Sequence, residues 1–323
     1  MVDDCSTDKS PQIIDEFDNK YECCRAIHLK ENMGSANGPR NVGIKESTGN
    51  YLMFMDNDDA YTPDACETLY KTMKENDVDI VYGRYRRTVR QGKSNQKSYS
   101  PYKDNLELNY PNETIDSSKY LEVPDFIYDN IIKKILYGSY SGKKYNTTEK
   151  LDFIKINNIN EEPDLLTMPP AVWNKLFKKE LIVNNNIKFQ PFIIGEDLSF
   201  VHETFLKANG IILLNSFFAY NYYVRDDEGN ESISNTANFK LLNDLMKSYI
   251  YCRNLTKNSS KDIQNSINSH LLYWIKTWQK SELTKEENKL LLEKAKELQK
   301  IHTNSPKGLL LIKIIIQMIK VKV

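Results

Sequence analysis

Residues 51–59 read Tyr-Leu-Met-Phe-Met-Asp-Asn-Asp-Asp, a continuous apolar run that stops at an acidic cluster. Apolar side chains at successive positions predict a strand that is covered on both faces, as in α/β proteins. Helical patterns at residues 11–20 and from Pro63, and short apolar runs at residues 26–29 and 78–82, alternate around this strand. The sequence therefore predicts an α/β fold with a mainly parallel sheet and flanking helices.

The composition is that of a globular protein without a basic field. The chain has 323 residues, of which 40% are hydrophobic and 27% charged, and its 44 Lys and Arg balance 44 Asp and Glu. This balance argues against a nucleic-acid partner. Five cysteines, an odd number without a C-x-x-C pair, predict a reducing compartment. There is neither a signal peptide nor a run of about 18 uncharged apolar residues, so we expect a cytoplasmic protein.

The pattern changes along the rest of the chain. Residues 84–162 have weak periodicity and predict surface excursions with short helices. Beyond them, the sequence predicts a helix at residues 196–208 and strands at residues 211–214 and 217–224. From residue 238 the pattern is helical to the end.

The acidic cluster that ends the apolar run is a candidate metal site. Asp56 and Asp58 stand at i and i+2 as the chain leaves a buried strand, so their side chains point to the same side. Hard carboxylate oxygens suit Mg²⁺ or Mn²⁺, which complete their coordination with water and substrate phosphates. A diphosphate substrate follows from this interpretation. The alternative is a solvated turn whose acids favour the start of the helix at Pro63, and the spacing alone leaves both open.

A second acidic pair, Asp3-Asp4, stands before another predicted helix. Ligands of open α/β sheets bind at the carboxyl ends of strands, so two acidic strand ends suggest one shared crevice. Capping of the following helix by Ser6, Thr7 or Asp8 is the alternative interpretation of this segment.

Several short motifs occur in one order along the chain: Asp3-Asp4-x-Ser6-Thr7-Asp8, Asn32-x-Gly34, Arg40-Asn41-x-Gly43, Gly49-x-Tyr51, Phe54-x-Asp56-x-Asp58-Asp59 and Pro63. In this order and spacing the sequence resembles the family-2 glycosyltransferases, which have the Rossmann-like GT-A fold. The resemblance is specific over residues 2–83 and weaker over residues 169–234.

The resemblance implies roles for the acidic residues. Asp3 and Asp4 would contact the base and ribose of a nucleotide-sugar, with Asp4 accepting a hydrogen bond from the uracil of a UDP-sugar. Asp56 would lie near the ribose and Arg40 near the nucleotide. Asp58 matches the metal-binding position of the family's D-x-D motif, which implies Mn²⁺ or Mg²⁺ as cofactor.

Glu196-Asp197 resembles the family's E-D signature, in which the aspartate is the general base. An inverting transfer needs such a group, because the acceptor hydroxyl must lose its proton as it attacks the anomeric carbon. Asp197 is therefore the candidate catalytic base. The alternative is that both acids only favour the N-terminus of the predicted helix.

Two further segments resemble the acceptor and leaving-group side of the family. Trp173 opens a Trp-Asn-Lys-Leu-Phe segment, and an exposed indole stacks well on a sugar, although a Trp in an apolar run is as often a core residue. Arg225 follows Tyr222-Tyr223-Val224 and precedes Ser232-Ile233-Ser234, and would stabilise the departing diphosphate. An ordinary surface salt bridge is the alternative for Arg225.

The resemblance divides the chain into a nucleotide-sugar-binding GT-A core at residues 1–95, an acceptor-side region with the general base at 96–235 and a helical C-terminal region at 236–323. Family members have a strand and a helix before the first acidic pair, whereas this sequence starts at Met1-Val2. We therefore expect an N-terminally incomplete core, and the activity of the chain as given to depend on the absent unit.

The resemblance implies an inverting, metal-dependent enzyme that moves a sugar from a nucleotide-sugar donor to a hydroxyl of a glycan or lipid-linked acceptor in cell-surface polysaccharide biosynthesis. One alternative is a nucleotidyltransferase, which also uses paired acids and divalent metal and would release pyrophosphate. The other is a catalytically silent glycosyltransferase-like binding protein or truncated remnant.

Residues 306–323 form a basic amphipathic pattern. Lys313, Gln317 and Lys320 recur at helical spacing, and Leu, Ile and Met fill the remaining positions. Such a helix suits peripheral contact with the cytoplasmic surface of a membrane, where lysines meet anionic lipid. Packing on the protein's own core is the alternative.

Overall fold

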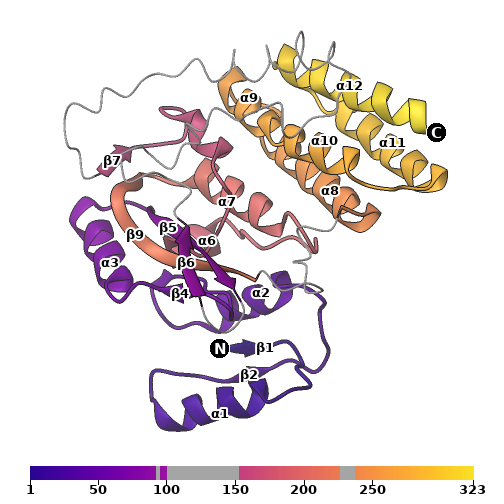
Figure 1. The fold of residues 1–323 in the computed structure, drawn as a ribbon. Coiled ribbons are helices and arrows are strands. Elements are labelled where there is room, and N and C mark those ends of the chain that lie inside the picture. The colour runs from indigo at the N-terminus through magenta and orange to yellow at the C-terminus, as the bar shows by residue number, and fades with distance from the viewer. Residues whose placement is uncertain (92–94, 100–152, 226–236) are drawn as a thin grey trace.

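The computed structural model describes residues 1–91, 95–99, 153–225 and 237–323 (Figure 1). Most of the predicted surface excursions and the Ser232-Ile233-Ser234 segment lie outside the described residues. Within the described part, the main sheet has seven strands in the order β3–β8–β5–β9–β4, with β6 paired to β5 and β7 paired to β9. These strands are β3 (Tyr51–Leu52), β4 (Ala60–Tyr61), β5 (Ile80–Gln91), β6 (Asn95–Tyr99), β7 (Phe153–Ile156), β8 (Lys175–Lys178) and β9 (Ile211–Arg225).

The predicted α/β fold class with flanking helices is confirmed, but the direction of the strands differs from the prediction. Only β5 and β9 pair in parallel in this sheet, and the remaining pairs are antiparallel. The prediction of a mainly parallel sheet is therefore wrong for these strands. A continuous apolar run carries no information on the direction of the neighbouring strands. The expected coverage of residues 51–55 on both faces is also wrong, because only Leu52 and Phe54 are buried and Met55 is 59% exposed.

The long strand β9 replaces the two strands predicted at residues 211–214 and 217–224. It runs beside β5, with a register shift next to Gly83. A Cβ atom on Gly83 would lie 2.7 Å from the Cβ of Ala219, so only glycine allows this close approach of the two strands.

A separate two-stranded parallel sheet lies at the N-terminal end. Its strands are β1 (Val2–Asp3) and β2 (Ile27–His28), with Asp3 opposite His28. Helix α1 (Ser10–Lys20) connects them and has no buried residue, and its Ile13 and Phe17 are exposed. In Figure 1 this unit lies below the main sheet, next to α2 (Asn37–Glu46).

The other helices cover the main sheet and extend it. Helix α7 confirms the helix predicted at residues 196–208. The elements are α3 (Ala65–Asn76), the 3₁₀ turn η3 (Pro163–Thr167), α6 (Lys179–Asn184), α7 (Glu196–Lys207), α8 (Phe239–Leu255), α9 (Lys261–Ser269), α10 (Leu271–Gln279), α11 (Lys285–Lys300) and α12 (Pro306–Lys322). Figure 1 shows α8–α12 gathered above the sheet.

The C-terminal helices share one hydrophobic core with the sheet. A single cluster of buried side chains runs from Ile44 through Phe177 and Phe200 to Ile319. A smaller cluster lies between α3 and the sheet and includes Leu69. The helical region is therefore packed against the sheet as part of the same folded body.

Helix α12 places its apolar side in this core. Ile312, Ile315 and Ile319 are buried, whereas Lys313 and Lys320 are exposed. Of the two interpretations of residues 306–323, the structure shows packing on the protein's own core. Among the described helices, none combines the length and apolar character needed to cross a membrane.

The packing of α12 predicts that two side-chain substitutions on this helix differ greatly in their effect on the free energy of unfolding. Ile315 is 1% exposed and Val321 is 88% exposed. We expect Ile315→Ala to lower the free energy of unfolding by about 2–5 kcal/mol, because it removes buried methylene groups and leaves a cavity. Val321→Ala should change it by less than about 0.5 kcal/mol. Urea unfolding of both variants measures this, and equal small effects would contradict the burial of α12.

Candidate functional site

Arg40 joins three acidic side chains from distant parts of the chain. Its Nη2 lies 2.7 Å from Asp56 Oδ1 and its Nη1 lies 2.6 Å from Asp197 Oδ1. The same Nη1 is 3.5 Å from Glu196 Oε1, and the Arg40 side chain is only 12% exposed. Arg40 and Asp197 are 157 positions apart in sequence. The structure thus brings together four of the predicted site residues, and we call Arg40, Asp56, Glu196 and Asp197 the Arg40 cluster.

Local structure explains how each acid reaches Arg40. Asp56 follows the apolar run, in the connection between β3 and β4. Gly195 has a left-handed backbone, with φ of +89°, and stands immediately before α7, so Glu196 and Asp197 occupy the first helical turn. Acids are favoured there by the helix dipole and by the unpaired backbone N–H groups.

The cluster changes the acidity of its members. Burial raises the pKa of Asp197, and the nearby Arg40 opposes this shift. Burial, with the neighbouring charge of Asp197, raises the pKa of Glu196 to about 8, so this carboxyl carries a proton at neutral pH. For Arg40, burial acts to lower the pKa, but the carboxylates of Asp197 and Asp56 outweigh it, so the guanidinium stays charged. Asp197 is therefore a carboxylate with increased affinity for a proton, as a general base requires.

Trp173 is buried and has no open ring face for a ligand. It packs next to Tyr220, which contacts the Asp56 loop, the connection between β3 and β4. It is 8% exposed and stacks on Tyr220 with ring centroids 4.4 Å apart and on Tyr222 at 5.6 Å. The hydroxyl oxygen of Tyr220 accepts a hydrogen bond from the backbone N–H of Asp56 at 3.1 Å. The structure thus favours the core alternative for Trp173, which supports the Asp56 loop through Tyr220.

The two members of the acidic pair, Asp3 and Asp4, contact different segments of the chain. Asp3 is 5% exposed and accepts from the backbone N–H of Ser6 at 3.3 Å. Hydrogen bonding with the Ser6 side chain is the main cause of its lowered pKa. Asp4 holds the loop at Asn32-x-Gly34, because its Oδ1 accepts from the backbone N–H of Met33 at 2.9 Å and its carbonyl accepts from Asn32 Nδ2 at 2.8 Å. The capping interpretation also has support, since Asp8 Oδ1 accepts from the N–H of Ser10 at 2.8 Å.

Sequence reasoning missed two residues of this region. His28 bridges Asp3 and Asp15, with ring nitrogens 3.3 Å and 2.8 Å from their carboxylates, and the hydrogen bond with Asp15 is the main cause of its raised pKa. Lys175 is buried, donates to Asn174 Oδ1 at 3.0 Å, and has a pKa lowered to about 7 by burial, an effect that the charge of Asp197 opposes. The position of Lys175 within an apolar segment was the sequence signal that could have indicated a buried basic side chain.

A cation site would rest on few protein ligands. Asp58 is partly exposed, and among the described residues no three or more His, Cys, Asp or Glu side chains gather closely enough to hold a metal ion. A hard carboxylate such as Asp58 fits Mg²⁺ or Mn²⁺ when water and substrate phosphates supply the other ligands.

Arg225, the predicted leaving-group residue, is the last residue of β9, and its backbone pairs with Arg90.

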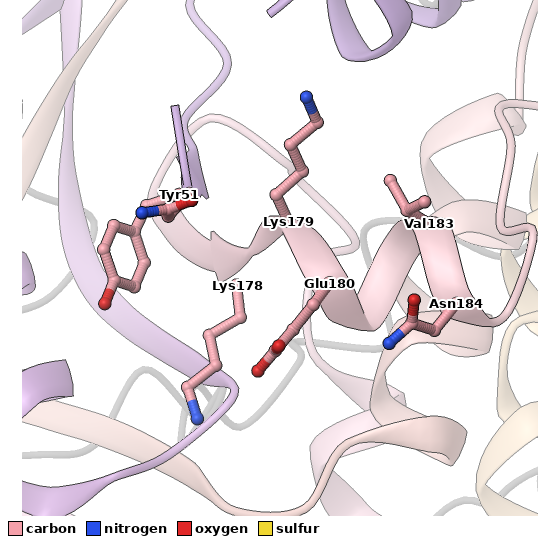
Figure 2. A pocket seen from close by; sticks show the side chains of 7 residues that line it. Tyr51, Lys178, Lys179, Glu180, Val183 and Asn184 are labelled. Atoms are coloured by element: carbon pink, nitrogen blue, oxygen red, sulfur yellow. The ribbon is translucent and has the colours of Figure 1, made fainter. Parts of the chain in front are cut away.

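A surface pocket of about 440 Å³ lies apart from the Arg40 cluster. Figure 2 shows the side chains that line it between β3 and α6, with Lys178 and Lys179 pointing in opposite directions. Lys178 Nζ pairs with Asp77 Oδ1 at 2.9 Å, and Lys179 Nζ donates to the carbonyl of Ser47. Because both lysines serve structural contacts and the pocket contains none of the predicted site residues, we assign the candidate site to the Arg40 cluster.

The comparisons with known proteins find glycosyltransferases. Residues 1–136 match the family model described as Glycosyl transferase family 2. The chain is 27% identical over 264 residues to the cholesterol galactosyltransferase of Borreliella burgdorferi, covering 80% of this chain and 62% of that protein. It is 29% identical over 273 residues to the poly(ribitol-phosphate) beta-N-acetylglucosaminyltransferase TarP of Staphylococcus aureus, covering 79% and 67%.

The fold is similar to that of a solved structure. The crystal structure of S. aureus TarS 1-349 in complex with UDP superposes with a TM-score of 0.59 at 16% identity, covering 99% of this chain and 80% of that one. The chain spans 62% and 57% of the lengths of the cholesterol galactosyltransferase and of the glycosyltransferase GlyG of Streptococcus pneumoniae, respectively.

The raised pKa of Glu196 predicts a pH-dependent effect of Glu196→Gln. The native state binds this proton more tightly than the unfolded chain does, because the fold raises the pKa from 4.5 to about 8. Ionising Glu196 therefore costs stability progressively as the pH rises between these values. The neutral variant avoids this cost, so we expect its stability relative to the wild type to rise across this range and to level off above it.

Urea unfolding at about pH 5, 7 and 8.5 measures this difference. The control is Glu286→Gln, which changes an exposed acid in the first turn of another helix, α11. A stability difference for Glu196→Gln that stays constant with pH would contradict the environment described for this carboxyl.

Proposed function

We propose that this chain, which belongs to the family-2 glycosyltransferases and has their GT-A fold, transfers a sugar from a UDP-sugar to a hydroxyl of a glycan or lipid-linked acceptor. The convergence of Asp56 from a strand end and Asp197 from the first turn of α7 on Arg40 carries this proposal. The names of the relatives support it, since they include galactosyl- and N-acetylglucosaminyltransferases. The TarS structures with UDP and UDP-GlcNAc support the choice of donor.

Asp197 acts as the general base of an inverting transfer. Its carboxylate takes the proton from the acceptor hydroxyl while that oxygen forms a bond to the anomeric carbon. The bond from this carbon to the diphosphate oxygen breaks, and its electron pair leaves with the diphosphate. Burial strengthens Asp197 as a base, whereas Arg40 keeps it ionised and fixes one of its oxygens.

The nucleotide lies over the carboxyl ends of the N-terminal strands. Asp3 and Asp4 bind its base and ribose, and Asp4 also positions the loop around Met33. Asp56 and Arg40 flank the ribose and the nucleotide. Glu196, neutral at pH 7, adds a hydrogen-bonding group without a second negative charge beside Asp197.

Two further residues assist the departure of the diphosphate. Asp58 would hold Mn²⁺ or Mg²⁺, which would supply positive charge to the diphosphate when bound. Arg225, at the end of β9, serves the leaving-group side. Trp173 contributes by supporting Tyr220 beneath Asp56 rather than by stacking on a sugar.

The chain works at the cytoplasmic face of a membrane when its acceptor is lipid-linked. Helix α12 would contact that surface through the exposed Lys313 and Lys320, because its isoleucines are already buried in the core. Each such lysine contributes about 1 kcal/mol near anionic lipid.

Asp197→Asn tests the transfer reaction. Removing the base should lower kcat for UDP release about 10²- to 10⁴-fold, because the acceptor hydroxyl then keeps its proton. A donor screen with UDP- and GDP-sugars, Mn²⁺ and a glycan acceptor measures UDP release. Asp262→Asn is the matched control, since Asp262 is an exposed acid in the first turn of α9. Release of pyrophosphate would favour a nucleotidyltransferase, and glycan binding without turnover would favour the silent binding protein.

Asp58→Ala tests the metal site. We expect the Mn²⁺-dependent part of UDP affinity to fall at least about tenfold, which corresponds to about 1.4 kcal/mol, while UDP binding without metal stays unchanged. Calorimetric titration of UDP with and without Mn²⁺ measures both terms. Asp64→Ala, an exposed acid before α3, is the control. Retention of the full Mn²⁺ effect in Asp58→Ala would refute the assignment.

A further inference from the structure

The loop that leads into α7 is held from one side by α2, the helix that carries Arg40. Asn41 exchanges two hydrogen bonds with the backbone of Phe189, each 2.9 Å long. Asn37 Nδ2 donates to the carbonyl of Phe192 at 2.9 Å. These contacts fix the first part of the loop relative to Arg40.

Helix α8 holds the second part of the same loop. Asp244 Oδ2 accepts from the backbone N–H of Ile193 at 3.0 Å, and Ser248 Oγ donates to the carbonyl of Gly195 at 2.7 Å. Asp244 is 5% exposed and Ser248 is fully buried. The two residues stand four positions apart, so they lie on one face of α8.

Gly195, immediately before α7, lies close against α8. A Cβ atom at this position would lie 2.9 Å from the Cβ of Ser248, and the backbone is already left-handed. The carbonyl of Gly195 also accepts from the backbone N–H of Ser199 at 3.2 Å, within the first turn of α7. Ser248 therefore binds the same carbonyl that begins the helix carrying Asp197.

We propose that Ser248 and Asp244 of α8 are positioning residues for Asp197, which they hold in place through the backbone of Ile193 and Gly195. This inference rests on the proposed function, in which Asp197 is the base. It adds residues of the C-terminal helices to those that affect the transfer reaction. Neither residue touches a reacting atom, so both act through the geometry of the loop.

The inference predicts a selective loss of turnover. Without the Ser248 hydroxyl, the Gly195 carbonyl loses one of its two hydrogen bonds and the first turn of α7 is free to shift. A displacement of about 1 Å in a reacting group costs on the order of 100-fold in rate. Ser248→Ala should therefore lower kcat about 10- to 100-fold. The donor KM and the affinity for UDP should remain unchanged, because the residues proposed to bind the base and ribose stand on other segments of the chain, Asp3 and Asp4 at the end of β1, Arg40 on α2 and Asp56 before β4.

Ser266→Ala is the matched control for Ser248→Ala. Ser266 is also buried in a C-terminal helix, α9, and its Oγ lies 3.3 Å from Asp164 Oδ1, away from the α7 loop. We expect a loss of stability in both variants and a loss of kcat in Ser248→Ala alone. In an Asp197→Asn background, Ser248→Ala should cause no further loss of the residual rate, because the residue through which it acts has already been removed.

Asp244 supplies an independent second test. Asp244→Asn keeps an oxygen that accepts from Ile193 and should retain kcat within about threefold, whereas Asp244→Ala should lose it like Ser248→Ala. This pair carries the test if Ser248→Ala does not fold.

Two results would overturn the inference while the proposed function stands: full kcat in Ser248→Ala, or an equal loss of kcat in Ser248→Ala and Ser266→Ala. A wild-type protein that releases no UDP would refute the proposed function itself, and the inference with it.

Discussion

The contacts of one guanidinium with three acidic side chains hold the site together. Arg40 contacts Asp56, Asp197 and, at longer range, Glu196, with little solvent access. Removing one of these partners is destabilising, because the remaining charge is left without compensation, and the partial exposure of Asp56 and Asp197 reduces this cost below that of a fully buried pair. The raised pKa of Glu196 relieves part of the excess negative charge, since this carboxyl is neutral at pH 7. The arrangement therefore requires that α2, the segment that contains Asp56 and the start of α7 keep fixed positions relative to one another.

Contacts outside the Arg40 cluster fix the position of the loop before α7. The Asn37 and Asn41 amides tie the loop before α7 to α2, and Asp244 and Ser248 tie it to α8. Helix α8 is in turn fixed by the core that includes Trp274, whose indole N–H donates to the carbonyl of Leu242 at 2.8 Å. The helical C-terminal region thus contacts the loop that leads to the candidate base Asp197, even though it contributes no residue to the Arg40 cluster.

The sequence was sufficient to predict local features of this fold and site. The acids at the start of α7 are a local signal and lie where they were predicted, whereas the apolar run before Asp56 forms a strand only at Tyr51–Leu52. The contact of Arg40 with Asp197 was not predictable from spacing, because it joins residues 157 positions apart and depends on the packing of α2 against the α7 loop. Strand direction and the burial of Trp173 were missed or left open for the same reason, since both are set by neighbours distant in sequence.

The charge of the site bears on how it would bind a diphosphate. Arg40 and Lys175 are the cations that act on Asp197 within the described residues, and neither is free to neutralise phosphates. Arg40 is already paired with two carboxylates, and Lys175 is buried with a pKa lowered to about 7. With Asp56 and Asp197 ionised, the Arg40 cluster has an excess of negative charge. A diphosphate beside it would be repelled unless an additional cation accompanied it, which is the physical argument for a divalent ion that arrives with the nucleotide and uses Asp58 as its protein ligand.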